Sequence, residues 1–229
     1  MSQEIESCAT LLQQRFGPDV LCDAVALDGE AEPLWPAERA AVAQAVPRRQ
    51  REFAAGRACA RRLLERLGLP PAAVPANADR SPIWPAGAIG SIAHDASICV
   101  VAVAKAGPLL SLGVDVEPDA PLEDELWPTV CSPRELAALL RRPGPERGAA
   151  ARLVFSAKES VYKCLHPLLR IPLRFHDVEL ELASDGGFRA RLCGRAPPWR
   201  GAPLDGFHAR SSGWLLTGMR LPPAAETST

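Results

Sequence analysis

The sequence lacks paired cysteines. Its seven cysteines stand singly, none belongs to a Cys-x-x-Cys motif, and their number is odd. This arrangement argues against a disulfide framework and against a cysteine-based zinc site. Several cysteines lie within apolar stretches, such as Cys99 between Ile98 and Val100. We therefore expect buried, free thiols in a reducing compartment.

The sequence also lacks an excess of charge and a long apolar run. Its formal net charge is −1, so no overall field would hold nucleic acid or an anionic membrane. No apolar run approaches the roughly 20 residues of a membrane-spanning helix. The first ten residues carry Glu4 and Glu6 and do not form an export signal. We expect a cytoplasmic protein.

Lysine is scarce. Of the 26 basic residues, only Lys105, Lys158 and Lys163 are lysines. Arginine and lysine are not equivalent where a site needs a compact and flexible positive charge. The closeness of Lys158 and Lys163 in the sequence indicates such a site, and chance clustering of two residues is the alternative.

The pattern of apolar residues, prolines and glycines predicts helices and strands in both halves of the chain. We expect helices over residues 36–45, 48–67 and 146–165, with another beginning at Ser132. We expect strands over residues 97–105, 109–117, 176–182, 188–192, 207–210 and 214–220. Helices followed by adjacent antiparallel strands predict an α+β fold with two α/β lobes, residues 1–108 and 109–229. The tail from Pro222 is expected to be unstructured.

The strand predicted over residues 109–117 ends with two carboxylates. Asp115 and Glu117 face the same way, because alternate residues of a strand share a face. Two such carboxylates can share one hard cation, and magnesium typically takes one or two carboxylates together with phosphate oxygens. The alternative is a strand end with a solvated acidic face, and this segment taken alone favours that alternative.

The helix predicted over residues 146–165 carries Lys158 and Lys163. At about 100° per residue, Glu159, Lys163 and His166 gather opposite the apolar side of the helix. Lys158 lies between the two sides, where its stem can pack and its ammonium group can reach out. The alternative is an ordinary amphipathic helix with an ion pair between Glu159 and Lys163.

The helix predicted over residues 48–67 has a charged residue within its apolar stripe. Arg57 lies about 40° from Phe53 on the helical wheel, on the side that also carries Leu64. An unpaired guanidinium there would be very costly, so Arg57 needs an anionic partner. A carboxylate of the protein or a phosphate of a ligand would meet this need.

Residues 80–94 lead into a buried strand and end at His94. Gly87 and Gly90 permit close approach of the backbone to another group. A lone histidine at the mouth of a strand is more often structural than functional. This segment taken alone therefore does not identify a site.

Together these segments resemble the family of phosphopantetheinyl transferases, in particular its Sfp-like group and the EntD-like branch that serves siderophore synthesis. The matching strings follow the family's order and spacing between about residues 36 and 220. They are Arg49-x-x-Glu52-Phe53-x-x-Gly56-Arg57, Arg80-x-Pro82-x-Trp84-Pro85, Gly90-Ser91-Ile92-x-His94, Gly113-Val114-Asp115-Val116-Glu117 and Phe155-Ser156-x-Lys158-Glu159-Ser160-x-Tyr162-Lys163. The last two strings together are highly specific for this family.

The resemblance implies two similar α/β lobes in one chain, with the active site at their interface. It implies that Asp115, Glu117 and Glu159 bind magnesium, or manganese in its place. It also implies a set of residues that bind coenzyme A: Arg49, Arg57, Arg80, Ser91, His94, Lys158 and Lys163. Of these, Arg57, Arg80 and His94 would bind the adenosine 3′-phosphate end and the two lysines would lie near the phosphates. Many relatives have a serine where this chain has Ala93, so that hydroxyl contact is missing or is supplied by Ser91.

The implied activity is transfer of the phosphopantetheine arm of coenzyme A to a serine of an apo acyl or peptidyl carrier protein. Lys158 or Lys163 would offset charge on the leaving adenosine 3′,5′-bisphosphate. Glu159, or a metal-bound water that it orients, would take the proton of the serine. We expect a monomer that acts on coenzyme A and a carrier protein, with no nucleic-acid or membrane partner.

Two alternatives come from other classes of protein. The first is a non-catalytic module that binds coenzyme A or a carrier protein, which would not need all three carboxylates. The second is a magnesium-dependent phosphohydrolase that uses the same carboxylates on water. A requirement for a carrier protein as acceptor would separate a transferase from the phosphohydrolase.

Overall fold

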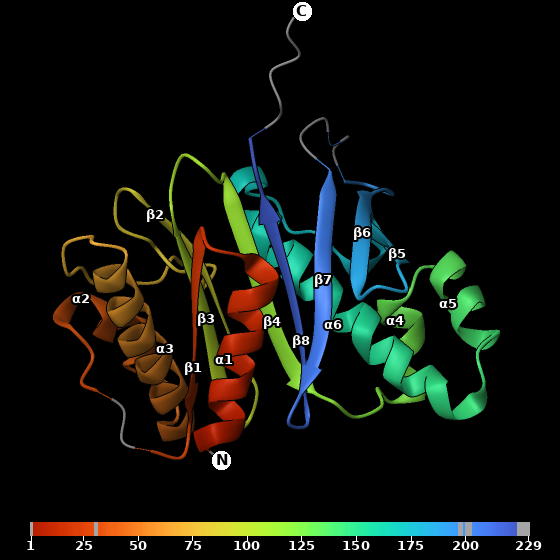
Figure 1. The fold of residues 1–229 in the computed structure, drawn as a ribbon, viewed down its shortest axis with the longest axis horizontal. Coiled ribbons are helices and arrows are strands. Elements are labelled where there is room, and N and C mark those ends of the chain that lie inside the picture. The colour runs from red at the N-terminus through yellow and green to blue at the C-terminus, as the bar shows by residue number, and fades with distance from the viewer. Residues whose placement is uncertain (1, 30–31, 197–198, 200–202, 224–229) are drawn as a thin grey trace, which may run out of the picture.

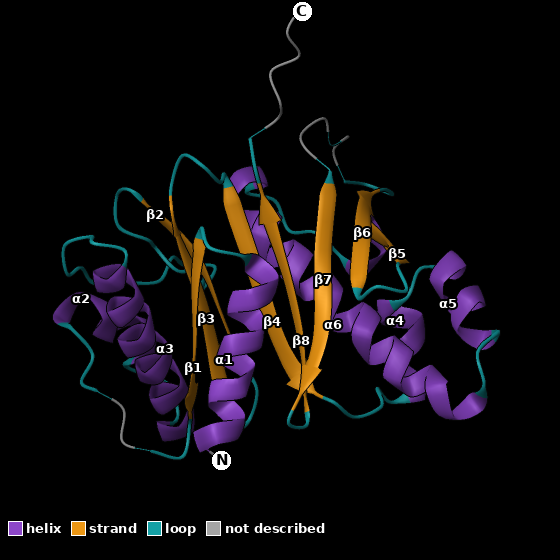
Figure 2. Ribbon diagram, in the orientation of Figure 1, coloured by secondary structure: helices purple, strands orange, loops and turns teal. Residues whose placement is uncertain are grey.

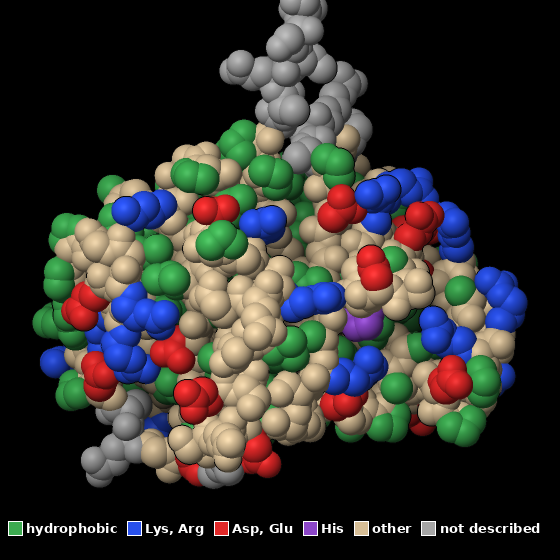
Figure 3. Space-filling model, in the orientation of Figure 1, with side chains coloured by type: hydrophobic (Ala, Val, Ile, Leu, Met, Phe, Trp, Pro, Cys, Tyr) green, Lys and Arg blue, Asp and Glu red, His purple; other side chains and the backbone are tan. Residues whose placement is uncertain are grey.

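The structure is a computed structural model that describes residues 2–29, 32–196, 199 and 203–223. Two antiparallel sheets stand side by side, with helices packed against them (Figures 1 and 2). This mixed arrangement confirms the predicted α+β class. No helix in the described part of the chain is both long and apolar enough to cross a bilayer. On the face drawn in Figure 3, basic and acidic side chains are interspersed.

The first half of the chain forms a three-stranded sheet in the order β1-β3-β2. These strands are β1 (Val20–Ala26), β2 (Ala88–His94) and β3 (Ile98–Lys105). The central strand β3 is buried from Ile98 to Ala104, because helices cover both of its faces. Burial on both faces explains why its sequence is continuously apolar instead of alternating.

The second half of the chain forms a five-stranded sheet in the order β4-β8-β7-β6-β5. Its strands are β4 (Ser111–Pro118), β5 (Val178–Leu182), β6 (Gly187–Leu192), β7 (Leu204–Ser211) and β8 (Trp214–Leu221). All neighbouring strands are antiparallel. Short turns at residues 183–186 and 212–213 join β5 to β6 and β7 to β8 as hairpins, in agreement with the strands that the sequence predicted there.

The helices form the outer layers of the molecule. The described helices are α1 (Ser2–Phe16), α2 (Pro36–Arg39), α3 (Pro47–Arg66), α4 (Trp127–Val130), α5 (Pro133–Leu140) and α6 (Gly144–Leu169). Short 3-10 turns are η1 (Ala40–Val42), η2 (Asp124–Leu126) and η3 (Phe175–Asp177). Helix α5 begins at the expected Ser132 cap, where Ser132 and Glu135 exchange hydrogen bonds in a capping box.

Three apolar cores hold these layers together. Helix α3 packs on one face of the three-stranded sheet, and α6 packs on one face of the five-stranded sheet. Helix α1 contributes Ile5, Leu12 and Phe16 to a third core that also contains Val114 of β4 and Leu216 of β8. The N-terminal helix therefore covers residues of both sheets (Figure 1).

Strands β2 and β4 lie next to each other where the two sheets meet. The backbone N–H of Val114 donates to Ser91 Oγ at 3.1 Å across this junction. On its other side, β4 touches α6 at Gly113, where an added Cβ would lie 2.0 Å from the carbonyl oxygen of Ser160. Only glycine permits so close an approach of strand and helix.

Several elements differ from the sequence-based expectations. The helix expected over residues 36–45 is a short α2 that continues as η1, and the helix expected over residues 146–165 extends in both directions as α6. Helix α1 and strand β1 were not predicted, although Ile5, Leu12 and Phe16 have helical spacing. The unstructured tail expected from Pro222 lies, beyond residue 223, outside the described residues.

Candidate active site

Strand β4 presents two carboxylates to helix α6. Asp115 is buried, with Oδ1 accepting a hydrogen bond from Lys163 Nζ at 2.5 Å and Oδ2 accepting one from Ser156 Oγ at 2.8 Å. Glu117 accepts a hydrogen bond from Arg152 Nη1 at 2.9 Å. Arg152, Ser156 and Lys163 share one face of α6, because they are spaced by four and seven residues. The helix thus supplies the positive charges that hold both carboxylates.

Glu159 shares this electrostatic environment. Burial, together with the nearby charge of Asp115, raises the pKa of Glu117 to about 7, although Arg152 opposes the shift. Burial also raises the pKa of Glu159, where Lys163 opposes the shift and Asp115 adds to it. Three carboxylates thus meet two cationic side chains, Lys163 and Arg152. An added cation would favour the charged forms of Glu117 and Glu159 and would so lower their pKa values.

The donor chemistry of these residues fits a hard metal ion. Within the described ranges, no three His, Cys, Asp or Glu side chains lie close enough to hold an ion as they stand. Lys163 and Arg152 instead occupy oxygens of Asp115 and Glu117. A donor set made only of carboxylate oxygens suits magnesium or manganese and disfavours soft ions. A metal ion would therefore take over positions that these two cations now fill.

A cavity of about 440 Å³ lies between residues 77–84, strand β2 and helix α6. Four of the predicted site residues line it: Arg80, Ser91, Glu159 and Lys163. They come from a loop, a strand and a helix that are distant in the sequence. Ser91 is buried and already accepts the hydrogen bond of Val114, so its hydroxyl proton remains for a ligand.

A larger cavity of about 770 Å³ adjoins the first, since Glu159 and Tyr162 line both. Residues 173–178 form much of its wall, including the apolar side chains of Leu173, Phe175 and Val178. Glu159 therefore stands where the two cavities meet, and polar and apolar residues line both. An extended substrate could occupy both.

Arg49 and His94 meet beside the start of α3. Arg49 Nη1 contacts His94 Nε2, and the same nitrogen lies 3.4 Å from Glu52 Oε2. Burial and the charge of Arg49 lower the pKa of His94. The structure brings these two predicted residues together, but neither lines the cavity that contains Arg80.

Arg57 is buried without a carboxylate partner among the described residues. Its Nε donates to the carbonyl oxygen of Val74 at 2.9 Å, and its guanidinium lies 3.8 Å from the ring centroid of Phe53. Its Nη2 has no hydrogen-bond partner. Burial lowers the pKa of Arg57 to about 10. Such an unpartnered buried donor is rare in native proteins, and an oxygen of an anion would satisfy it.

Lys158 differs from its expected position. Its ammonium group was expected to reach out of the helix, but its side chain is only 1% exposed. Nζ donates to the carbonyl oxygens of Val130 and Phe175, each at 2.9 Å, and to Glu135 Oε2 at 2.6 Å. All three N–H groups are therefore used within the protein. In this arrangement no donor of Lys158 is free for a phosphate.

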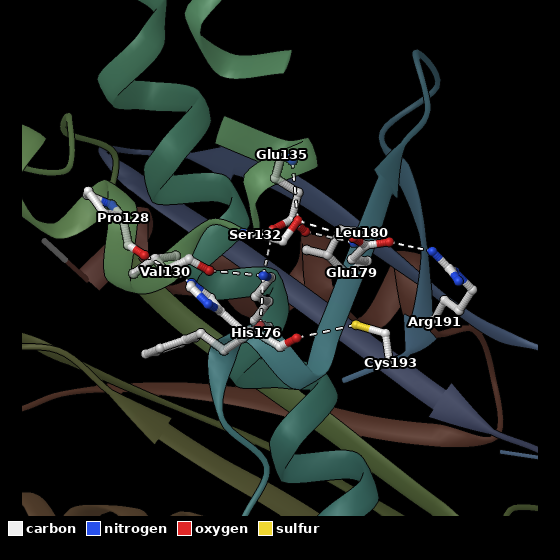
Figure 4. A network of polar contacts seen from close by, with 11 residues as sticks. Pro128, Val130, Ser132, Glu135, His176, Glu179, Leu180, Arg191 and Cys193 are labelled. Carbon is white, nitrogen blue, oxygen red and sulfur yellow. Dashed lines mark hydrogen bonds and ion pairs between the residues drawn. The ribbon is translucent and has the colours of Figure 1, made fainter. Parts of the chain in front are cut away.

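The partner of Lys158 belongs to a wider polar network (Figure 4). Glu135 also accepts hydrogen bonds from the backbone N–H groups of Ser132 at 2.7 Å and Leu180 at 2.8 Å. His176 Nε2 lies 2.9 Å from the carbonyl oxygen of Pro128. The network ties α5, α6, η3 and β5 together next to Glu159.

Sequence reasoning missed two groups of residues. Arg152 and Ser156 contact the carboxylates of β4, and their helical spacing from Lys163 was already visible in the helix predicted over residues 146–165. The buried ion pair of Arg61 with Glu38, at 2.7 Å, carries no local signal because its partners belong to different helices.

Comparisons with known proteins show which sequences this chain resembles. The model of the 4′-phosphopantetheinyl transferase N-terminal domain matches residues 37–104, and that of the 4′-phosphopantetheinyl transferase superfamily matches residues 111–208. The chain is 42% identical over 203 residues to 4′-phosphopantetheinyl transferase Svp of Streptomyces mobaraensis, covering 85% of this chain and 81% of that protein. It is 32% identical over 194 residues to 4′-phosphopantetheinyl transferase PptT of Mycobacterium tuberculosis, covering 81% and 85%. Enterobactin synthase component D of Salmonella typhi is 33% identical over 148 residues, covering 62% and 59%.

Proposed function

This chain belongs to the 4′-phosphopantetheinyl transferase superfamily, and we propose that it modifies carrier proteins at the junction of its two sheets. The enzyme transfers the phosphopantetheine arm of coenzyme A to a carrier protein. The acceptor is a serine hydroxyl, and adenosine 3′,5′-bisphosphate leaves. The observation that carries the location is the cavity that gathers Arg80, Ser91, Glu159 and Lys163.

The two sheets correspond to two α/β lobes, residues 1–108 and 109–229, with the active site between them. The junction of β2 with β4 and the separate family matches on either side of residue 108 support this division. We propose that the protein acts as a cytoplasmic monomer.

Coenzyme A binds with its adenosine end at the first lobe. Arg80 and Ser91 line the 440 Å³ cavity. Arg49 and Ser91 contact the ligand, and Arg57, Arg80 and His94 serve its 3′-phosphate. The unpartnered Nη2 of Arg57 supports this role, because a phosphate oxygen would satisfy it. Lys158 was expected near the phosphates, but its three internal hydrogen bonds leave that contact to Lys163 unless the side chain turns.

Asp115, Glu117 and Glu159 hold magnesium, or manganese in its place. When bound, this ion neutralises oxygens of the coenzyme A pyrophosphate. Lys163, which lies beside Asp115, would offset charge on the leaving phosphate. Glu159, or a metal-bound water that it orients, would take the proton of the serine.

Intact-mass spectrometry of purified carriers tests this function. Apo acyl carrier and apo peptidyl carrier proteins are incubated with coenzyme A and magnesium, with and without the enzyme. A gain of one phosphopantetheine arm is expected, and a Ser→Ala carrier should gain nothing. Enterobactin synthase relatives make siderophore carriers a rational choice among the peptidyl carriers. Release of adenosine 3′,5′-bisphosphate without any acceptor would instead indicate a hydrolase.

A further inference from the structure

The loop that carries Arg80 is fixed by a dense turn. Asp79 Oδ1 accepts hydrogen bonds from Ser81 N at 2.9 Å and from Ser81 Oγ at 2.5 Å. Asn77 Nδ2 donates to Ser81 Oγ at 2.9 Å, and Asn77 O accepts the N–H of Arg80 at 2.9 Å. Arg80 itself has φ of 70°, a left-handed conformation that few residues other than glycine adopt. Surrounding contacts must hold such a conformation in place.

One of these contacts crosses the cavity to helix α6. Asp79 Oδ2 lies 2.8 Å from His166 Nε2, 87 positions away in the sequence. Both residues line the 440 Å³ cavity, opposite each other on the loop and on the helix. With its proton on Nε2, the His166 ring donates this hydrogen bond. The hydrogen bonds from Ser81 and His166 hold the pKa of Asp79 well below its usual range, so Asp79 is present as the carboxylate.

The helix end of this contact is rigid. The side chain of His166 is 12% exposed, whereas that of Asp79 is 42% exposed. The His166 ring stacks on Tyr162, with centroids 5.0 Å apart and planes 20° apart. The carbonyl oxygen of His166 accepts the N–H of Arg170 at 2.9 Å. Arg170 also lines the cavity with a left-handed backbone, at φ of 54°. His166 is therefore connected to both arginine-bearing turns at the cavity.

We propose that His166 and Asp79 are positioning residues that form a strut across the cavity and hold Arg80 ready for the 3′-phosphate of coenzyme A. This inference rests on the proposed function, in which Arg80 serves that end of the ligand. The strut joins the first lobe to the second between two residues that line the binding cavity. Without it Arg80 keeps its charge, but its loop loses its only hydrogen bond to α6 among the described residues. If the Arg80 guanidinium must be ordered when the ligand binds, the entropy lost in ordering it weakens the affinity, whereas a preorganised guanidinium avoids this cost.

Binding of adenosine 3′,5′-bisphosphate and of adenosine 5′-monophosphate measures this role directly, because the two probes differ only in the 3′-phosphate. The ratio of their dissociation constants is obtained by titration calorimetry for the wild type and three variants. His166→Phe keeps a ring to stack on Tyr162 but cannot donate. Asp79→Asn is an exposed change whose single oxygen cannot serve both Ser81 and His166. His166→Gln places an amide donor near the position of Nε2.

We expect His166→Phe and Asp79→Asn to reduce the preference for the 3′-phosphate by about three- to tenfold, less than the loss of a charged hydrogen bond itself would cause. His166→Gln should restore most of the preference. Asp185→Asn is the matched control, since Asp185 accepts a hydrogen bond from the residue two positions on, Gly187, in a turn outside both cavities. It should leave the ratio unchanged.

The outcomes separate this proposal from the function on which it rests. A wild type that shows no preference for the 3′-phosphate refutes the assignment of Arg80 and this proposal with it. A wild type that shows the preference, with both variants equal to it, overturns the strut alone. If His166→Phe does not fold, Asp79→Asn decides the matter by the same ratio. If Asp185→Asn reduces the preference for the 3′-phosphate as much as the other variants do, the strut is also overturned. A general loss of order in the turns would then explain the reduced preference.

Discussion

Replacing Arg57 by methionine separates a residue kept for a ligand from one kept for the fold. The substitution removes the hydrogen bond to Val74 and the contact with the Phe53 ring, together worth about 1–3 kcal/mol. It also removes a buried donor without a partner, whose burial costs about 1–3 kcal/mol. Because these terms nearly cancel and methionine packs well among apolar residues, the melting temperature should stay the same or rise.

Ligand binding should respond differently. Loss of a charged hydrogen bond to phosphate costs about 1.5–3 kcal/mol, which corresponds to a roughly 10- to 150-fold weaker affinity for coenzyme A. Dephospho-coenzyme A lacks the 3′-phosphate and should bind the variant and the wild type almost equally. Thermal melts and titrations with both ligands measure these effects. A marked loss of stability, with equal loss of affinity for both ligands, would show that Arg57 serves the fold.

Arg61 provides a matched control on the same helix. It is as buried as Arg57, but it pairs with the fully buried Glu38 at 2.7 Å. Breaking a buried ion pair by removing one partner typically costs about 3–5 kcal/mol. Arg61→Met should therefore lower the melting temperature strongly and should not distinguish the two ligands. Equal behaviour of the two variants would contradict the contrast drawn between their environments.

Three further predictions follow from contacts at or near the site. Asp115→Ala or Glu117→Ala should abolish transfer while the folded structure persists. Intact-mass assays at saturating magnesium would measure the transfer, with circular dichroism as the control for folding. Near-wild-type turnover would show that these residues do not hold the metal. Lys158→Met should destabilise the protein by about 3–5 kcal/mol in urea denaturation, because it leaves Glu135 buried and unpaired. The double variant Lys158→Met/Glu135→Leu should recover much of that loss in the same measurement. The pKa of His94 is lowered in the folded protein, so the unfolded chain binds the proton more readily and the stability should fall as the pH drops below about 6.5. The denaturation midpoint of His94→Gln should fall less over the same pH range. Identical pH profiles of the variant and the wild type would contradict this assignment.

Much of the fold could be predicted from local patterns. Pro47 in the first turn indicates the start of helix α3, and the Ser132 cap indicates the start of α5. Strand β3 was recognised because burial on both faces makes its sequence continuously apolar. Helix α1 was missed although its apolar spacing is regular, and its partners come from both sheets. Local periodicity indicates a helix but not what the helix covers.

The site was less predictable than the fold, since side-chain partners come from distant segments. The helical wheel placed Lys158 at a boundary between faces, and only the approach of Glu135 from α5 determines that its ammonium points inward. Arg152 was overlooked for the same reason, because its role depends on α6 packing against β4. Arg57 could be singled out beforehand, since a charge within an apolar stripe is anomalous in any packing arrangement.

The absence of a side chain at Gly113 sets the distance between strand β4 and helix α6 at the active site. Asp115 on β4 can accept the hydrogen bond of Lys163 on α6 at 2.5 Å because Gly113, two residues earlier, has no side chain to separate the strand from Ser160. A methyl group there would begin 2.0 Å from a backbone oxygen, so strand and helix would have to separate by about 1 Å or more. Displacements of about that size can cost a hundredfold in rate. Mutational tolerance at this position is thus governed by clearance, and a residue with no functional group controls how closely the functional groups meet.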